Sequence, residues 1–519
     1  MKQVLLFLSS MFLSILVFSQ NQTPEISNLQ VLVDSPNQMT VSYDLADTEN
    51  DDLEITFRVS SDGGETFTVN TSAATGDLGF PLSPGVGKTI TWDFSTEIQI
   101  GGNYKVMLVA DDLQAVDIQS IVDQVDSNRL LTDLQFIEGI RHRNVGATHL
   151  QEVKDLINDH FISHDLETEI LAFSWNGYNA ENIVGRKRGL IAETETYIID
   201  GHFDTVIQSP GADDNGSAIA GVMEALRVLA PYQFGKTIKF IGFDLEEEGL
   251  VGSREYVDNG GIKNYETING VFNFEMIGYY DDSPNSQTLP FGFDQLFPDA
   301  YNAVAGDEFR GNFITNIGIY NHPGLSDAFE NAATTYVPDL RVISVLAPEG
   351  WAFITPDLGR SDHAAFWLQA MPALMLTDGS NFRNPNYHTA NDVVSTLDFT
   401  FMSNVVKATV AAIAELADIR HSTFQITEVD IPTSTENVFD CAFNVFPNPN
   451  AEFIKVDFSL CGLGGFDIKI YNTAGKILYA KDQVAGLQTI STKHFPSGTY
   501  VLFIQKGEQS IEKKMVVSR

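Results

Sequence analysis

The stretch that most constrains the fold is residues 196–218, TYIIDGHFDTVIQSPGADDNGSA. Its first five residues are a short apolar run, which predicts a buried strand. Residues 216–230 have helical spacing and good helix formers, so the predicted unit is strand, acidic loop and helix. His202 and Asp204 therefore lie just past the carboxyl end of a strand, where open α/β sheets place ligand sites. Imidazole and carboxylate together suit Zn²⁺, although the loop alone is also compatible with an Asp-rich turn that caps the helix.

Further candidate metal ligands follow other predicted strands. The strand KTIKFIGFDL (236–245) leads into Glu246 and Glu247, and INGVFNFEMI (268–277) contains Glu275. A carboxylate among Phe and Met side chains is costly to bury unless a cation or hydrogen bonds balance it. His388 follows in NPNYHTAND. Acids and histidines at successive strand ends of one sheet predict a metal site at its carboxyl edge.

Residues 117–420 alternate strands with amphipathic helices, such as the helix expected over 148–163. This alternation predicts an α/β domain, a mostly parallel sheet sandwiched by helices. Residues 21–116 read as short alternating strands between turns, which favours an immunoglobulin or fibronectin-III-like β-sandwich. Residues 421–442 are expected to be a linker, and residues 443–519 to be a separate β-module. In that module nine Lys/Arg outnumber six Asp/Glu, unlike the acidic remainder.

The ends and the charge of the chain bear on where it works. Residues 1–20 carry one Lys and then an apolar run, which predicts a cleaved signal peptide and export, with no transmembrane anchor in the mature protein. The formal net charge of −38 excludes nucleic acid as an expected partner. Cys441 and Cys461 are compatible with a disulfide in an oxidising compartment, and the sequence leaves their pairing open.

Six motifs between residues 201 and 392 carry a family resemblance: GHFDT, PGADDNGSA, EEEGLVGS, NFEMIGY, GRSDHAAF and NPNYHTAND. In this order they resemble the clan MH zinc exopeptidases, the group of bacterial leucyl aminopeptidases, aminopeptidase Y and glutaminyl-peptide cyclases. The resemblance implies a zinc-exopeptidase fold of the phosphorylase/hydrolase type and two zinc ions per chain. Asp214 would bridge the ions, His202 and Glu275 would complete one zinc site, and Glu247 and His388 the other.

The same resemblance implies catalytic roles. Glu246 would be the general base. It would take a proton from the water between the metals, which becomes hydroxide, and deliver that proton to the leaving amine. Asp204 would orient the ring of His202, and the Asp214–Asn215 peptide would be cis. Tyr387 and Arg360 match positions that contact substrate, and packing roles for them stay open. Of the neighbouring groups, His363 is not expected to be a ligand, and Asp213 and Glu248 are expected to face solvent or to cap helices.

The C-terminal module has its own resemblance. FNVFPNPN, FDIKIYNTAGKIL, FPSGTYVLFIQKG and KKMVVSR resemble the type IX secretion sorting domain. This implies export by signal peptide and then passage across the outer membrane, with the type IX machinery as partner and a secreted or cell-surface location.

For the function of the whole chain, the leading hypothesis is an aminopeptidase acting on peptides or proteins. A glutaminyl-peptide cyclase, which is a transferase, and a surface binding or adhesion protein remain alternatives, and dipeptidases and carboxypeptidases share the metal set.

Overall fold

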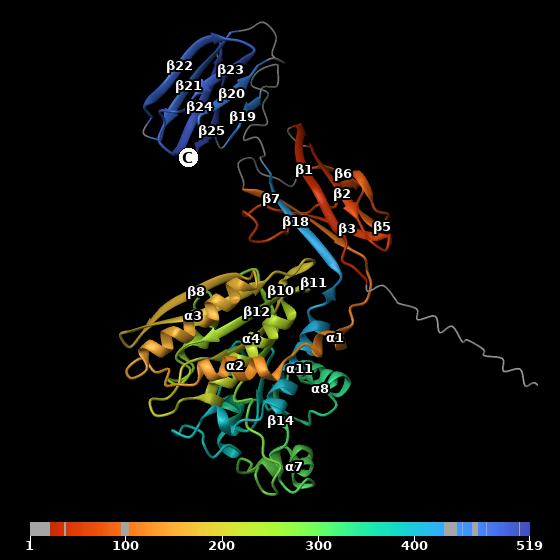
Figure 1. Cartoon of the computed structure of the whole chain (residues 1–519), viewed down its shortest axis with the longest axis vertical. Coiled ribbons are helices and arrows are strands. Elements are labelled where there is room, and N and C mark those ends of the chain that lie inside the picture. Colours follow the sequence, from red (N-terminus) through yellow and green to blue (C-terminus); the bar gives the residue numbers. More distant parts are fainter. Residues whose placement is uncertain are drawn as a thin grey trace, which may run out of the picture. The chain divides into compact units, whose positions relative to one another are not determined.

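The structure is a computed structural model that describes residues 21–35, 38–94, 103–429, 444–448, 450–458, 465–473, 475–507 and 509–519. The predicted signal peptide and both cysteines lie outside these residues. The chain forms an N-terminal β-sandwich, a central α/β domain and a C-terminal β-module, each described here by itself (Figure 1).

An eight-stranded sheet forms the centre of the α/β domain, in the order β15-β14-β16-β13-β10-β12-β9-β8. Its strands are β8 (Glu167–Trp175), β9 (Tyr178–Lys187), β10 (Ala192–His202), β12 (Lys236–Phe243), β13 (Thr267–Phe274), β14 (Ile314–Ile319), β15 (Val342–Ala347) and β16 (Ala373–Thr377). The adjacent strands β16, β13, β10 and β12 are parallel. By contrast, β9 runs against β12, β8 against β9, and β14 against β16. The predicted α/β class with a mostly parallel sheet is confirmed.

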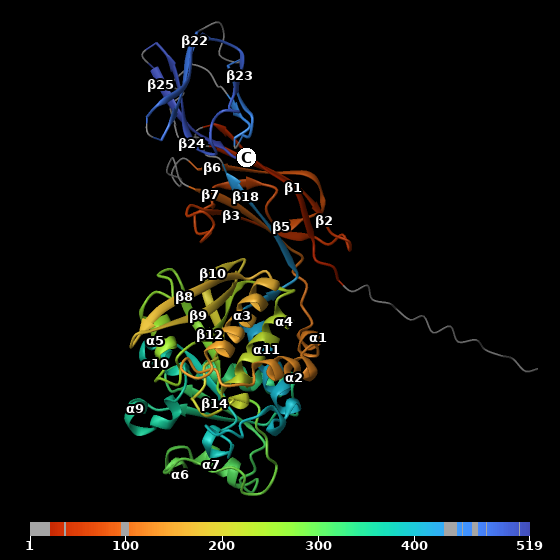
Figure 2. The same ribbon diagram turned by 60° about the vertical axis from the view of Figure 1, so that its left-hand side comes forward.

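Helices cover both faces of this sheet (Figure 2). One layer contains α1 (Ile118–Val122), α2 (Ser127–Ile137), α3 (Ala147–Ser163), α4 (Ala218–Leu229), α8 (Pro323–Tyr336) and α11 (Phe399–Leu416). The other contains α5 (Val251–Asp258), α6 (Phe293–Leu296), α7 (Pro298–Ala305), α9 (Trp351–Ile354) and α10 (His363–Leu368). A two-stranded ribbon pairs β11 (Gln233–Phe234) with β17 (Ile419–Arg420).

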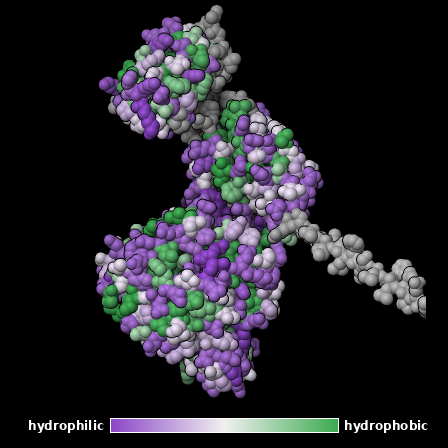
Figure 3. All heavy atoms as spheres, in the orientation of Figure 1, coloured by the Kyte–Doolittle hydropathy of each residue, from purple (hydrophilic) through white to green (hydrophobic). Residues whose placement is uncertain are grey.

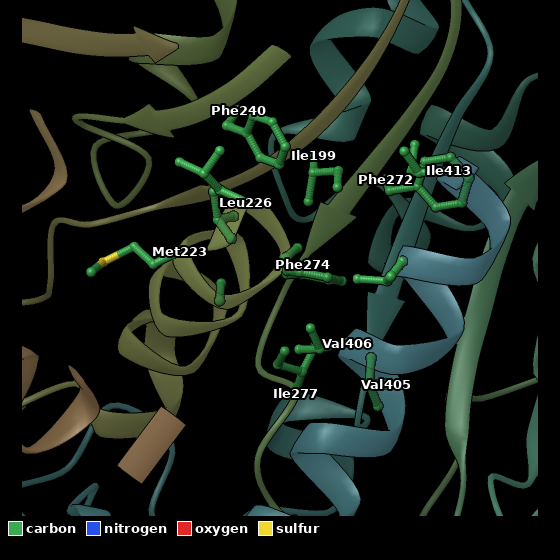
Figure 4. Packing of buried hydrophobic residues seen from close by; sticks show 14 of the residues in the cluster. Ile199, Met223, Leu226, Phe240, Phe272, Phe274, Ile277, Val405, Val406 and Ile413 are labelled. Carbon is green, nitrogen blue, oxygen red and sulfur yellow. The ribbon is translucent and has the colours of Figure 1, made fainter. Parts of the chain in front are cut away.

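The larger core lies between β10, β13, α4 and α11. Figure 4 shows Phe272 and Phe274 of β13 among side chains of α4 and α11, and all of these are buried. Because a Cβ at Gly201 would lie 2.6 Å from the Cβ of Ala218, only glycine lets β10 approach the start of α4 this closely. Among the described residues α11 alone has the length and hydropathy of a membrane span, and 67% of that stretch is buried inside the fold. It is therefore a core helix of this domain.

The N-terminal module consists of two four-stranded sheets, β1-β2-β6-β4 and β18-β7-β3-β5. Its strands are β1 (Glu25–Ser35), β2 (Gln38–Ala46), β3 (Leu53–Ser60), β4 (Ala74–Gly76), β5 (Gly79–Leu82), β6 (Gly85–Asp93), β7 (Tyr104–Asp111) and β18 (Ser422–Val429). The last strand falls in the stretch expected to be a linker. Its residues alternate only weakly in burial, and its strand conformation depends on pairing with the distant β7. Residues 430–442 of the expected linker lie outside the described residues.

The C-terminal module consists of the sheets β19-β20-β23 and β22-β21-β24-β25. Its strands are β19 (Asn444–Phe446), β20 (Phe453–Asp457), β21 (Phe466–Asn472), β22 (Ile477–Val484), β23 (Leu487–Ser491), β24 (Gly498–Lys506) and β25 (Gln509–Val517). Alternate residues such as Ile468, Ile470, Leu502 and Ile504 form its buried core. The visible surfaces of the modules are mostly hydrophilic with scattered apolar residues (Figure 3), in keeping with the strong net charge.

Candidate metal centre

The candidate ligands lie at the carboxyl ends of adjacent parallel strands. His202 is the last residue of β10, Glu247 follows β12, and Glu275 directly follows β13. His388 lies in the loop after β16. Asp214 lies in a short helical turn, Ala212–Ser217, between β10 and α4. Because parallel neighbours end at one edge of the sheet, residues far apart in the chain meet there.

The five side chains form two groups of three that share Asp214. His202, Asp214 and Glu275 make one group, and Asp214, Glu247 and His388 the other, with ligand atoms within 4.8 Å of one another in each. His202 Nε2 lies 3.6 Å from Asp214 Oδ1 and 3.5 Å from Glu275 Oε2. His388 Nε2 lies 3.0 Å from Asp214 Oδ2 and 3.2 Å from Glu247 Oε2. Each oxygen of Asp214 therefore faces a different group.

The donor set fits divalent cations. Each group offers one imidazole nitrogen and carboxylate oxygens, the donors that Zn²⁺ takes in three-residue sites. Glu247 Oε1 is buried, and no donor among the described residues hydrogen-bonds to it. An uncompensated buried carboxylate oxygen is costly unless a cation neutralises it. The residues present therefore suit a pair of zinc ions with Asp214 between them.

The acids of the centre repel one another. Burial, and then the charge of Asp214, raises the pKa of Glu247 to about 7. Burial also raises the pKa of Glu246 well above its ordinary value, with Glu275 and Asp362 adding to the effect and His202 opposing it. Burial alone would lower the pKa of His202, but the charge of Glu246 and the hydrogen bond to Asp204 outweigh it and raise that pKa strongly. The protein thus concentrates negative charge where cations would bind.

Asp204 contacts two parts of the centre. Its Oδ1 lies 3.4 Å from His202 Nδ1, on the side of the ring away from Asp214. Its two carboxylate oxygens accept hydrogen bonds from the backbone N–H groups of Glu246 (3.0 Å) and Glu247 (3.2 Å). Asp204 therefore ties the imidazole ligand to the loop that carries the neighbouring acids. Glu246 Oε2 lies 3.6 Å from His202 Nε2, beside the first group.

Several residues that hold the ligands were not predicted. Asp392 accepts hydrogen bonds from the backbone N–H groups of Asp213 (2.8 Å) and Asp214 (3.1 Å). Glu275 Oε2 accepts hydrogen bonds from Ser361 Oγ (2.8 Å) and Asn215 Nδ2 (3.3 Å). Asp392 and Ser361 belong to the motifs NPNYHTAND and GRSDHAAF, so their position in a motif was the available signal.

The backbone around the centre has unusual conformations. The Asp214–Asn215 peptide is cis, as the resemblance implies. Leu245 and Met276, which adjoin Glu246 and Glu275, have φ of 61° and 53°, and His388 has φ of 58°. Left-handed backbone at residues other than glycine is costly and concentrates at functional sites, where surrounding contacts enforce it.

The prediction for Asp213 was wrong. Its side chain is fully buried and accepts hydrogen bonds from Gly278 N (3.0 Å) and Asn384 Nδ2 (2.7 Å), so it links two loops behind the centre. The acid-rich sequence suggested solvent because sequence alone does not show these partners. Glu248 is partly exposed, 3.8 Å from His142 Nε2. His363 is buried with Nε2 2.8 Å from the carbonyl of Leu358, and burial lowers its pKa to about 4.

A pocket adjoins the first group. Glu275, Arg360 and Tyr387 line the side nearest the candidate ligands. Arg360 Nη2 donates to the hydroxyl of Tyr387 at 3.1 Å, and the Tyr387 ring stacks on His388 at 3.8 Å between centroids. The remaining wall is mainly apolar: Leu289, Phe293, Phe313, Ile317, Ile343 and Met375. The site therefore combines a charged centre with an apolar recess.

Two parts of the chain match known protein families. Residues 182–413 match peptidase family M28, and residues 444–518 match the secretion system C-terminal sorting domain. The uncharacterized protein YfbL of Escherichia coli (strain K12) is 32% identical over 226 residues, which are 41% of this chain and 65% of that protein. Aminopeptidase YwaD of Bacillus subtilis (strain 168) is 34% identical over 118 residues, 22% of this chain and 26% of that protein. The chain thus spans less than two thirds of the length of these relatives.

Among solved structures, the LapA aminopeptidase of Legionella pneumophila is similar with 22% identity and a TM-score of 0.45. The similarity covers 58% of this chain and 73% of that chain.

Proposed function

We propose that this chain, whose residues 182–413 match peptidase family M28, is a secreted di-zinc aminopeptidase. Such an enzyme hydrolyses the peptide bond after the N-terminal residue of a peptide or protein. The name of the Bacillus subtilis relative supports the choice of aminopeptidase. The observation that carries the proposal is the pair of three-residue groups that share Asp214.

The donor set defines what each side chain would do. His202 and Glu275 would hold one zinc ion, Glu247 and His388 the other, and Asp214 both. Zinc in such a pair supplies an activated water and polarises the substrate carbonyl. The shared carboxylate keeps two binding positions adjacent, because its two oxygens face opposite groups.

Glu246 is the proposed general base. It lies beside the first group, 3.6 Å from His202 Nε2, and burial raises its pKa well above the ordinary value, which makes it a stronger base than an exposed carboxylate. It would take the proton from the attacking water and deliver it to the leaving amine. Asp204 supports this step by fixing the backbone N–H groups of Glu246 and Glu247.

Tyr387 and Arg360 are the proposed substrate-contacting residues. The Tyr387 hydroxyl is already paired with Arg360 Nη2, and both side chains line the pocket beside Glu275. A phenol and a guanidinium at this place can donate hydrogen bonds to the oxygen that becomes negative during attack. The apolar wall behind them would receive the side chain of the N-terminal residue. We therefore expect a preference for substrates whose N-terminal residue is large and apolar, such as leucine or phenylalanine.

Export is the second part of the proposal. The match of residues 444–518 to the sorting domain supports delivery through the type IX machinery to the cell surface or beyond. With the signal peptide predicted at residues 1–20, the enzyme would act on peptides outside the cell.

A peptide-library digest read by mass spectrometry tests the function. We expect loss of single N-terminal residues, arrest by a chelator and recovery with zinc, and no trimming by Glu246→Gln. Removal of C-terminal residues, or conversion of N-terminal glutamine to pyroglutamate without hydrolysis, would replace the aminopeptidase with a carboxypeptidase or a cyclase. Protein that holds two zinc ions yet changes no peptide would refute an enzymatic role.

A further inference from the structure

Arg141 is an arginine buried behind the metal centre. It lies between α2 and α3, and its side chain has no exposed surface. A buried guanidinium is costly unless its N–H groups are satisfied, so its partners indicate what it holds in place.

All of its side-chain partners are backbone carbonyls. Nε donates to the carbonyl of Phe203 at 2.6 Å, and Nη2 donates to that of Gly211 at 2.8 Å. Nη1 lies 3.0 Å from the carbonyl of Pro210 and also contacts carbonyls of its own segment. Among the described residues no carboxylate forms an ion pair with it. Residues 203–211 form the loop between β10 and the turn that carries Asp214, and Arg141 thus joins the start of this loop, directly after His202, to its end.

The backbone of Arg141 makes a second connection to the start of this loop. Its N–H donates to Thr205 Oγ1 at 2.9 Å, and its carbonyl accepts from the N–H of Thr205 at 3.2 Å. At the end of the loop Gly211 has φ of +61°, and a Cβ there would lie 2.4 Å from Asp214 O and from Thr205 Cγ2 and 2.9 Å from Arg141 Nη2. Both ends of the loop are therefore packed closely around the Arg141 side chain and held by its hydrogen bonds.

The charge of Arg141 also faces the centre. Burial lowers its pKa to about 10, so it stays protonated at neutral pH, and the nearby acids Asp392, Asp204, Asp214 and Glu247 favour the charged form. A fixed positive charge behind the bridging Asp214 offsets part of the repulsion among these carboxylates.

We propose that Arg141 is a positioning residue that sets the separation of His202 and Asp214, and hence the metal affinity of the first group. This inference rests on the proposed di-metal site. His202 belongs to the first group alone, and Arg141 hydrogen-bonds to the residue that directly follows it, whereas among the described residues no hydrogen bond joins Arg141 to Glu247 or His388 of the second group. The N–H of Asp214 also donates to Asp392 Oδ2 at 3.1 Å, a contact in which Arg141 takes no part. Loss of the guanidinium should therefore weaken one ion more than the other.

The test is a cobalt titration of metal-free protein, followed by visible absorption, with zinc affinities from competition with a chelator. Wild-type protein should bind two ions. Arg141→Lys keeps the positive charge but cannot hydrogen-bond to both ends of the loop, and we expect one ion to bind about 10- to 100-fold more weakly while the other is unchanged. Excess zinc should restore most of kcat, which a general loss of folding would not allow.

Arg227→Lys is the matched control. Arg227 pairs with Asp133 in the helical layer, so its replacement should lower the melting temperature and leave both metal affinities unchanged. If Arg141→Lys does not fold by circular dichroism, Thr205→Val decides, because it removes only the hydroxyl that accepts from Arg141 N–H. We expect this variant to weaken the same ion by about 3- to 10-fold.

The inference is overturned if folded Arg141→Lys binds metal at both sites with wild-type affinity. If Arg141→Lys does not fold, the same result in Thr205→Val overturns it. Equal weakening of both ions would overturn it as well, because the contacts of Arg141 favour the first group. A wild-type chain that binds no metal would instead refute the proposed function. The two failures are therefore distinguishable.

Discussion

Replacing Asp204 by asparagine should weaken the metal centre without altering its ligands. The carboxylate accepts one backbone N–H on each oxygen, from Glu246 and Glu247, and faces His202 Nδ1. Asparagine keeps one acceptor oxygen and turns an NH₂ group toward the other N–H donor. The substitution therefore removes one charge-assisted hydrogen bond and leaves a donor without an acceptor.

The magnitude follows from these contacts. A hydrogen bond to a charged group contributes about 1.5–3 kcal/mol, which corresponds to roughly a 10- to 150-fold change in an equilibrium constant. This agrees with the usual loss of about 10- to 100-fold when a group that orients metal ligands is replaced. We expect Asp204→Asn to lower zinc affinity by about this factor and to lower kcat further, because Glu246 shares the displaced backbone.

Zinc affinity is measured by competition with a chromogenic chelator, and kcat with an aminoacyl-anilide at saturating zinc. Glu248→Gln is the matched control, because Glu248 adjoins the same loop but is partly exposed and faces His142 instead of the centre. The reasoning fails if Asp204→Asn binds zinc and turns over substrate like the wild type, or if the control loses as much as Asp204→Asn.

Three further perturbations test other parts of the structure. Glu246→Gln should lower kcat by about 10²- to 10⁴-fold while two zinc ions remain bound, as shown by metal analysis; retained activity would exclude it as the base. Burial lowers the pKa of His160, whose Nε2 contacts the carbonyl of Met223, to about 4, so the unfolded state binds more protons between pH 4 and 6.5. The free energy of unfolding should therefore fall as pH drops through this window. Measured by urea unfolding at several pH values, this fall should be smaller in His160→Gln than in the wild type, and an equal fall would contradict the assignment. Leu289→Trp narrows the apolar pocket and should lower kcat/KM for N-terminal phenylalanine by about 10-fold or more relative to alanine, and an equal effect on both substrates would place the side-chain pocket elsewhere.

The sequence by itself predicted the order of the modules and the α/β class of the central domain. Hydrophobic periodicity is a local signal, so apolar runs such as that before His202 and the helix over 148–163 were visible without coordinates. The five candidate ligands could be chosen because each stands at the end of such a run or in a family motif. Their gathering around Asp214 then follows from parallel strands that end at one edge.

Only the tertiary structure decided how the centre is supported. Asp213 reads as a solvent-facing acid in the sequence, but Asn384, 171 residues away, hydrogen-bonds to it in the interior. Arg141 contacts a loop 70 residues away in the sequence. β18 becomes a strand by pairing with β7, although the whole central domain lies between the two in the sequence. No local pattern encodes these pairings, because each depends on two segments that approach only after the sheet has formed. Sequence periodicity predicts most of the helices and strands of the central domain, whereas long-range hydrogen bonds and burial determine which polar residues serve the site.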